Sequence, residues 1–129
     1  MPADSLLRRS RVSVLIVDDA TACRKAARAL LERCGYSVVD EADCAATALN
    51  YVKSLAPDAV LLDIHLPGGV DLTAHIRDVR PQIAVLLSSS DIDDQFYGLA
   101  EAHGARGYVP KDRLSHGDFA TFWPDATGT

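Results

Sequence analysis

Short apolar runs recur along the chain, and most of them end in polar or turn-forming residues. Such runs are typical of strands buried on both faces, as in a parallel sheet. The predicted strands cover residues 12–17, 36–42, 59–62, 83–87 and 106–109. The third is the clearest, because four apolar residues lead directly into Asp63 and then a Pro-Gly-Gly turn.

Between these runs, apolar residues fall at helical spacing. The first predicted helix presents a stripe formed by Cys23, Ala27, Leu30 and Cys34. Asp19 or Thr21 is expected to cap its start, and Gly35 is placed to end it. The cysteine spacing fits helical packing, and no histidine lies at zinc-ligand spacing from any of them. We therefore expect small, buried, reduced thiols.

Three further helices complete the pattern. Asp43 is expected to cap a helix that ends near Pro57, and residues 70–80 form a shorter one. Residues 91–94 are rich in aspartate and suit the first turn of a helix that Gly104 closes. The remainder, 112–129, is less regular, because Gly117 and Pro124 leave little room for a final helix. Its apolar residues are nevertheless expected to face the core: Leu114, Phe119, Phe122 and Trp123.

Strands that alternate with helices predict an α/β fold with a doubly wound, five-stranded parallel sheet and helices on both faces. The 129 residues suit one domain with one core. We expect this domain over residues 12–123, a flexible N-terminal tail over 1–11 and a C-terminal tail over 124–129. The lack of a linker-like segment after Trp123 favours a stand-alone protein.

Charge and composition narrow the function classes. The formal net charge of -5 argues against nonspecific binding to nucleic acid or to an anionic membrane. No apolar run approaches the ~18 residues of a membrane span. No apolar segment follows the arginines near the N-terminus, so they do not form a secretory signal. The expected location is the cytoplasm.

Carboxylates follow two of the predicted strands. Asp18 and Asp19 come directly after the first, and Asp63 ends the third. If these strands are neighbours, the three carboxylates share one pocket at the carboxyl edge of the sheet, where open α/β folds bind ligands. Like charges at close range favour a cation, and oxygen ligands suit Mg²⁺.

Two more strand ends supply polar groups. The serines at 88–90 bring hydroxyls, and Lys111 brings an ammonium. A carboxylate nucleophile, a metal, a hydroxyl and a lysine around one point suit phosphoryl transfer. Taken singly, the aspartates are turn formers or helix caps, the serines turn formers, and the lysine a solvated residue. Their joint occurrence at four strand ends favours the shared site.

Three motifs resemble the receiver domain of two-component response regulators: VLIVDD at 14–19, LLDIHLPG at 61–68 and GARGYVPK at 104–111. The resemblance covers nearly the whole chain. It implies a flavodoxin-like fold with strand order 2-1-3-4-5, an order that the CheY receiver protein illustrates.

The resemblance also implies roles for individual residues. Asp63 matches the phosphoacceptor, which also faces the metal. Asp18 and Asp19 match the acidic pair that holds Mg²⁺ or Mn²⁺, and the backbone carbonyl of His65 matches a further metal ligand. Lys111 matches the lysine that pairs with the phosphoryl group.

Two residues match the family's switch. Ser89 matches the hydroxyl residue, because it lies 22 positions before Lys111 (111 − 89), which is the family's usual spacing between the two. Tyr108 matches the aromatic residue whose rotation reports phosphorylation, and a plain strand aromatic is the alternative interpretation. The resemblance implies a sensor histidine kinase or histidine phosphotransfer protein as donor and a downstream protein as target. The expected partner face is formed by the fourth helix, the fifth strand and a final helix.

One departure from the family pattern motivates a second hypothesis. The turn after Pro67 is two residues shorter than the family's usual Pro-x-x-x-Gly. A pseudo-receiver, which binds proteins without phosphorylation, is the alternative that this loop suggests. A third, a phosphohydrolase for small molecules, would need a substrate cap for which the chain has no room. We therefore expect no enzymatic activity beyond self-phosphorylation and hydrolysis, no direct nucleic-acid or membrane binding, and a monomer or weak dimer.

Overall fold

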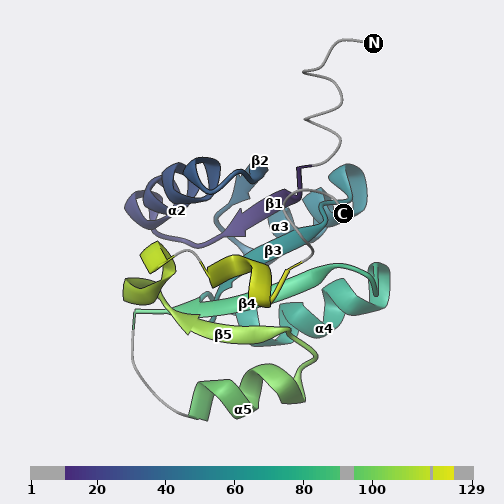
Figure 1. The fold of residues 1–129 in the computed structure, drawn as a ribbon. Coiled ribbons are helices and arrows are strands. Elements are labelled where there is room, and N and C mark those ends of the chain that lie inside the picture. Colours follow the sequence, from purple (N-terminus) through teal and green to yellow (C-terminus); the bar gives the residue numbers. More distant parts are fainter. Residues whose placement is uncertain (1–10, 91–94, 117, 124–129) are drawn as a thin grey trace.

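The computed structural model describes residues 11–90, 95–116 and 118–123 and contains the predicted strand–helix alternation (Figure 1). The strands are β1 (Ser13–Val17), β2 (Ser37–Ala42), β3 (Ala59–Asp63), β4 (Ala84–Ser89) and β5 (Gly107–Pro110). The helices are α2 (Thr21–Arg33), α3 (Ala45–Leu55), α4 (Gly69–Val79) and α5 (Gln95–Ala102). Two 3₁₀ helices follow, η1 (Lys111–His116) and η2 (Asp118–Thr121).

The five strands form one parallel sheet in the order β2-β1-β3-β4-β5, which confirms the flavodoxin-like fold. The central strands β1 and β3 are direct neighbours, with Val17 opposite Leu62. In the next pair, Asp63 lies opposite Ser88. Since parallel strands share one carboxyl edge, this order brings the ends of β1, β3 and β4 together.

Helices and turns cover the two faces of the sheet unequally. Because side chains alternate along a strand, β3 sends Val60 and Leu62 to one face and Ala59 and Leu61 to the other. The first face packs against α3, α4 and α5. The second packs against α2 and the two 3₁₀ helices (Figure 1). The second layer therefore contains only one α-helix among the described residues.

The C-terminal segment takes the place of a final α-helix. Leu114, Phe119 and Trp123 are buried as expected, whereas Phe122 is only half-buried. Phe119 stacks on Trp123 at 5.1 Å between ring centroids, and both rings meet Tyr36 edge-on. The expected partner face needs correction, because two short 3₁₀ helices stand where it assumed a final helix.

The predicted helix caps are wrong, but the predicted stop at Gly35 is confirmed. The residues before α2 and α3 are Ala20 and Cys44, without side-chain caps, so Asp19, Thr21 and Asp43 do not cap. Gly35 has φ +93°, and the amide of Tyr36 donates to the carbonyl of Leu31. This bond is the signature of a Schellman motif, in which glycine readily takes the left-handed conformation.

The buried face of α2 is wider than the expected stripe, of which Ala27, Leu30 and Cys34 pack against the core. Leu31, which the stripe omitted, is the fully buried residue of this helix, whereas Cys23 and Cys34 are half-buried. Cys44 is exposed, so the expectation of three buried thiols is wrong for this residue. All three are free thiols.

Several expectations fall on residues that the structure does not describe. These are the C-terminal tail, most of the N-terminal tail, and the aspartates at 91, 93 and 94 in the expected first turn of α5. None of the helices in the described ranges is both long enough and apolar enough to span a bilayer.

Candidate functional site

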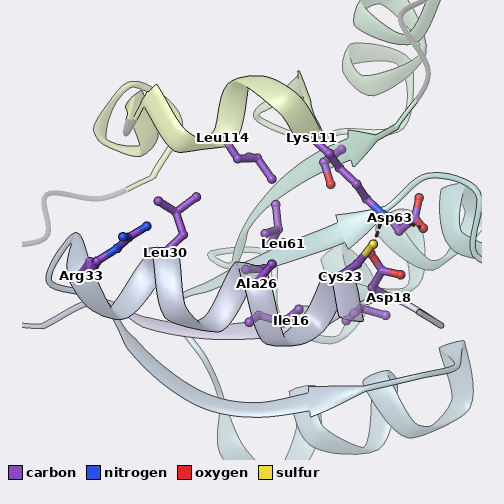
Figure 2. Close-up of a pocket in the computed structure, with 13 residues that line it drawn as sticks. Ile16, Asp18, Cys23, Ala26, Leu30, Arg33, Leu61, Asp63, Lys111 and Leu114 are labelled. Atoms are coloured by element: carbon purple, nitrogen blue, oxygen red, sulfur yellow. Dashed lines mark hydrogen bonds and ion pairs between the residues drawn. The ribbon is translucent and has the colours of Figure 1, made fainter. Parts of the chain in front are cut away.

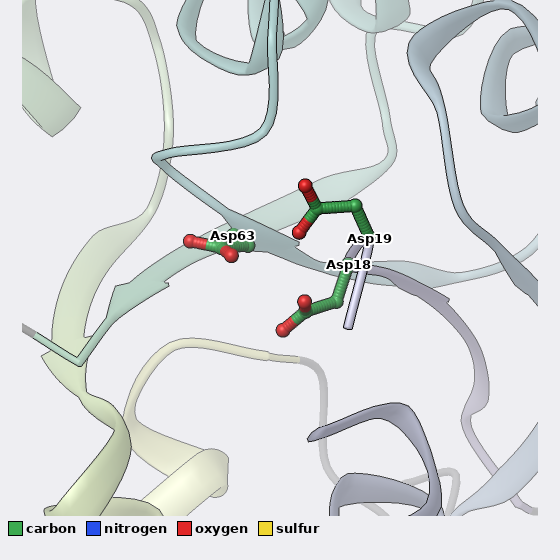
Figure 3. Close-up of side chains that lie close together, drawn as sticks. All are labelled: Asp18, Asp19 and Asp63. Atoms are coloured by element: carbon green, nitrogen blue, oxygen red, sulfur yellow. The ribbon is translucent and has the colours of Figure 1, made fainter. Parts of the chain in front are cut away.

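Three carboxylates converge at the carboxyl edge of the sheet. Asp18 follows β1, Asp19 is next to it, and Asp63 ends β3. One carboxylate oxygen from each lies within 4.8 Å of the other two (Figure 3). Asp18 and Asp63 are buried and Asp19 is exposed. The convergence expected from neighbouring strands is therefore present.

Lys111 reaches this cluster from the end of β5. Its Nζ lies 2.7 Å from Asp18 Oδ2 and 3.4 Å from Asp63 Oδ2. Burial of the ammonium lowers the pKa of Lys111, but the hydrogen bond to Asp18 and the charges of Asp63 and Asp18 outweigh burial and raise it above its ordinary value. Lys111 is thus a charged partner of the site and not a solvated surface lysine.

The raised pKa predicts slow reaction of Lys111 with amine reagents. Only a deprotonated amine reacts, and each unit of pKa removes a factor of about ten from that form. At pH 9, acetylation of Lys111 is expected to be at least about tenfold slower than that of Lys25 and Lys53, which are both exposed. Quantitative peptide mass spectrometry provides the measurement, with the two exposed lysines as internal controls. Equal rates at all three lysines would contradict the ion pairs.

Backbone groups orient the two buried carboxylates. The amide of His65 donates to Asp63 Oδ1 at 3.0 Å, and the amide of Ala20 donates to Asp18 Oδ1 at 2.9 Å. In both cases the donor lies two residues further along the chain, which is the geometry of an Asx turn. Each carboxylate therefore keeps a second oxygen, Oδ2, directed at Lys111.

Arg24 is a supporting residue that lies outside the predicted apolar stripe of α2. Its Nη1 donates to the backbone carbonyl of Asp18 at 2.8 Å, and its Nε pairs with Glu41 at 3.3 Å. Arg24 therefore ties α2 and β2 to the turn that carries Asp18. No spacing in the sequence indicated this contact.

The shortened loop after Asp63 closes on a glycine that borders the site. Helix α4 begins at Gly69, and a Cβ there would lie 2.8 Å from the backbone oxygen of Asp63. That distance is shorter than real Cβ contacts, so glycine is required. The short loop thus folds tightly against the backbone of Asp63 and leaves the acidic cluster intact.

The serines at the end of β4 point to opposite faces. Ser88 lies opposite Asp63 and lines a cavity with it, whereas Ser89 alternates to the other face. Both are buried. Alternation along β4 therefore gives the two serines different surroundings.

The ring of Tyr108 is also buried and meets Phe96 of α5 at 5.3 Å between centroids. The imidazole of His65 meets the other side of this aromatic pair, 5.7 Å from Phe96. His65 itself is exposed, and its amide holds Asp63. An aromatic row therefore joins the loop after Asp63 to β5.

Comparison with known proteins identifies the family. Residues 14–116 match the model of the response regulator receiver domain. The chain belongs to this family. The matched segment includes the acidic cluster and Lys111, so the site described above lies inside the receiver domain.

Individual relatives are response regulators. The receiver is 34% identical over 103 residues to response regulator GacA of Pseudomonas aeruginosa, covering 78% of this chain and 48% of GacA. It is 39% identical over 103 residues to the nitrate/nitrite response regulator protein NarP of Escherichia coli, covering 77% and 47%. The chain thus spans about half the length of these curated relatives.

A solved structure of a LuxR-family two-component response regulator from Aurantimonas sp. SI85-9A1 superimposes with a TM-score of 0.74. Its sequence is 36% identical, and the match covers 79% of this chain and 75% of that one. The agreement in both fold and sequence supports the assignment of this chain to the receivers.

The donor set of this receiver fits a hard divalent cation. The ammonium of Lys111 pairs with two of the three carboxylates and supplies one positive charge, so two negative charges of the cluster remain uncompensated (3 − 1 = 2). Carboxylate oxygens are ligands that Mg²⁺ prefers, and no cysteine or histidine belongs to the cluster in the described part of the chain. Asp18, Asp19 and Asp63 are therefore the residues that would hold such an ion.

Proposed function

We propose that this receiver accepts a phosphoryl group on Asp63 from a sensor histidine kinase or a histidine phosphotransfer protein. The observation that carries the proposal is the convergence of Asp18, Asp19 and Asp63 with Lys111 at one sheet edge. This is the set of charges that phosphoryl transfer to a carboxylate needs.

In the proposed step, a carboxylate oxygen of Asp63 attacks phosphorus. A P–O bond forms as the bond from phosphorus to the donor's nitrogen or oxygen breaks, and the electron pair leaves with the donor. The amide of His65 keeps the Asp63 carboxylate oriented. Lys111 moves its charge from Asp63 to the new phosphoryl oxygens, so the ammonium stays paired throughout.

Mg²⁺, or Mn²⁺ in its place, supplies charge neutralisation at the phosphoryl oxygens when bound. We propose Asp18, Asp19 and Asp63 as its side-chain ligands, with the backbone carbonyl of His65 as a further one. The exposed Asp19 has no partner among the residues that the structure describes. It is therefore available to the ion without breaking an existing contact.

Phosphorylation of Asp63 is then expected to shift a population of conformations. We propose Ser89 as the switch hydroxyl that moves toward the phosphoryl oxygens. Ser89 lies opposite Pro110 of β5, and Pro110 is two residues after Tyr108. Movement of Ser89 is therefore expected to displace β5. Tyr108 in turn packs on Phe96, which extends the change to α5. The proposed partner face consists of α5, β5 and the first 3₁₀ helix.

The partners follow from this scheme. We propose a histidine kinase or phosphotransfer donor on one side and a downstream protein target on the other. We propose no direct binding to nucleic acid or to membranes. The protein is proposed to be a monomer or weak dimer in the cytoplasm. The chain acts on no separate substrate and catalyses only acceptance and hydrolysis of its own phosphoryl group. A phosphorylation-independent module is not favoured, because the short loop leaves the acidic cluster intact.

The proposal predicts phosphorylation that depends on the metal and on Asp19. Asp19→Asn removes one ligand and is expected to weaken Mg²⁺ binding at least about tenfold, the lower end of losses for residues that only support a metal site. Asp112→Asn is the matched control, since Asp112 is exposed and outside the cluster. Calorimetry gives the affinity, and acetyl phosphate labelling with and without EDTA gives the function. Labelling that survives EDTA, or equal affinity in both variants, would refute the metal assignment.

A further inference from the structure

A cavity of about 320 Å³ lies between α2 and η1, on the face of the sheet that only one α-helix covers (Figure 2). This volume falls at the lower end of small-molecule pockets, which span about 300–1,000 Å³. The cavity is partly open to solvent. Its floor is formed by Ile16 and Leu61 of the sheet, and Leu114 of η1 lies across it from α2.

The cavity exists because neither α2 nor the 3₁₀ segment carries side chains large enough to fill the space between them. Helix α2 presents only small side chains along this stretch, namely Cys23, Ala26 and Ala27, with Leu30 one turn further on. Opposite them, the chain after Lys111 forms short 3₁₀ turns, whose larger apolar residues pack farther along against Tyr36. The middle of the layer is therefore left unfilled, with apolar walls.

The two ends of the cavity are polar and chemically different. Arg33 lines the end that is remote from Asp18 and Asp63, and it has no partner among the described residues. At the other end Ser88 is 2% exposed and lines the cavity, and its hydroxyl has no hydrogen-bond partner within the described ranges. A hydroxyl on the cavity wall can donate a hydrogen bond to a bound polar group or accept one from it.

From this arrangement we infer a binding site for a small amphipathic organic acid. The carboxylate pairs with Arg33, the apolar body lies along Ala26, Ala27 and Leu30, and a hydroxyl or carbonyl group at the far end meets Ser88. Cys23 and Arg33 are ten residues apart, so the site is about 15 Å long along the helix. An elongated ligand of medium chain length suits this shape.

This inference goes beyond the proposed phosphoryl acceptance and does not depend on it. Binding is a property of the α2–η1 cavity and requires no phosphorylation. Because Asp63 and Lys111 also line the inner end, an occupied cavity would place the ligand beside the acceptor. The site therefore gives a small molecule access to the edge of the proposed phosphorylation site.

Two alanine-to-phenylalanine substitutions on α2 test whether the apolar body of the ligand lies in the cavity. The probe is 10-hydroxydecanoate, titrated into the full chain by calorimetry, with amide chemical shifts used to locate it. Ala26→Phe fills the cavity and is expected to weaken binding at least tenfold. Ala29→Phe is the control, because Ala29 is also an exposed residue of α2 but does not line the cavity. It is expected to change affinity less than twofold.

Two further variants test the polar ends. Arg33→Gln is expected to weaken binding about threefold to fivefold, as for an exposed charge pair, with Lys25→Gln on the same helix as control. Ser88→Ala is expected to cost about threefold to tenfold, the value of one hydrogen bond. Thermal unfolding of each variant establishes that it is folded.

Three results would overturn the inference. The first is no binding of the probe up to its solubility limit. The second is equal loss of affinity in Ala26→Phe and Ala29→Phe, which would place the probe elsewhere. The third is a concentration-dependent dimer that Ala26→Phe disrupts in sedimentation, since a second copy of the chain would then cover the cavity.

Discussion

Replacing Asp63 by asparagine is expected to abolish phosphoryl acceptance. The amide keeps the shape of the side chain and still accepts the hydrogen bond from the amide of His65. It lacks the negative charge that makes the carboxylate a nucleophile, and it leaves Lys111 with Asp18 alone. Loss of the nucleophile typically costs at least about four orders of magnitude in rate. Labelling with acetyl phosphate and Mg²⁺, followed over time by intact mass, measures this loss.

Asp78→Asn provides the matched control for this experiment. Asp78 is an exposed aspartate on α4 outside the acidic cluster, and the same change of charge there is expected to leave labelling unchanged. Thermal unfolding of both variants establishes that they are folded. Undiminished labelling of Asp63→Asn would show that another residue accepts the phosphoryl group.

Truncating Trp123 to alanine is expected to destabilise the protein by about 3–5 kcal/mol, as for a large buried aromatic residue. Trp123 is 3% exposed and packs on Phe119 and Tyr36. This cluster holds the 3₁₀ segment on the sheet, where no final α-helix covers it within the residues that the structure describes. Urea unfolding followed by far-UV circular dichroism provides the free energy of unfolding.

Trp123→Phe separates packing from hydrogen bonding at this position. The indole Nε1 is buried without a hydrogen-bond partner among the residues that the structure describes, so phenylalanine removes an unpaired donor and keeps most of the aromatic contact. We expect a loss of about 1 kcal/mol or less, because relief of the unpaired donor offsets part of the lost packing. A loss below about 1 kcal/mol for Trp123→Ala would contradict tight packing of the 3₁₀ segment.

The sheet and the acidic site were predictable from sequence because both depend on strands. A strand buried on both faces is a continuous apolar run, and its carboxyl end is marked by the residue that follows it. Asp18 and Asp63 therefore appeared at strand ends before any contact was known. Their convergence then required only that β1 and β3 be neighbours, as the structure shows.

Features that depend on geometry between layers were not predictable. Asp43 has the residue type of a cap, but the chain enters α3 one residue later, with Cys44 before its first turn. The predicted stripe of α2 omitted Leu31, because spacing alone does not show how wide a face of a helix its sheet buries. The cavity beside α2 likewise reflects the volume left between Ala26 and Leu114, which no sequence pattern specifies.

Locating the phosphoryl group on the wild-type chain decides whether Asp63 is the acceptor. The chain is incubated with acetyl phosphate and Mg²⁺ and then reduced with borohydride, which converts an aspartyl phosphate to homoserine. Homoserine is expected at position 63 alone, and none is expected when EDTA replaces Mg²⁺. Homoserine at another aspartate, or none anywhere with excess donor and metal, would contradict phosphoryl acceptance at this site.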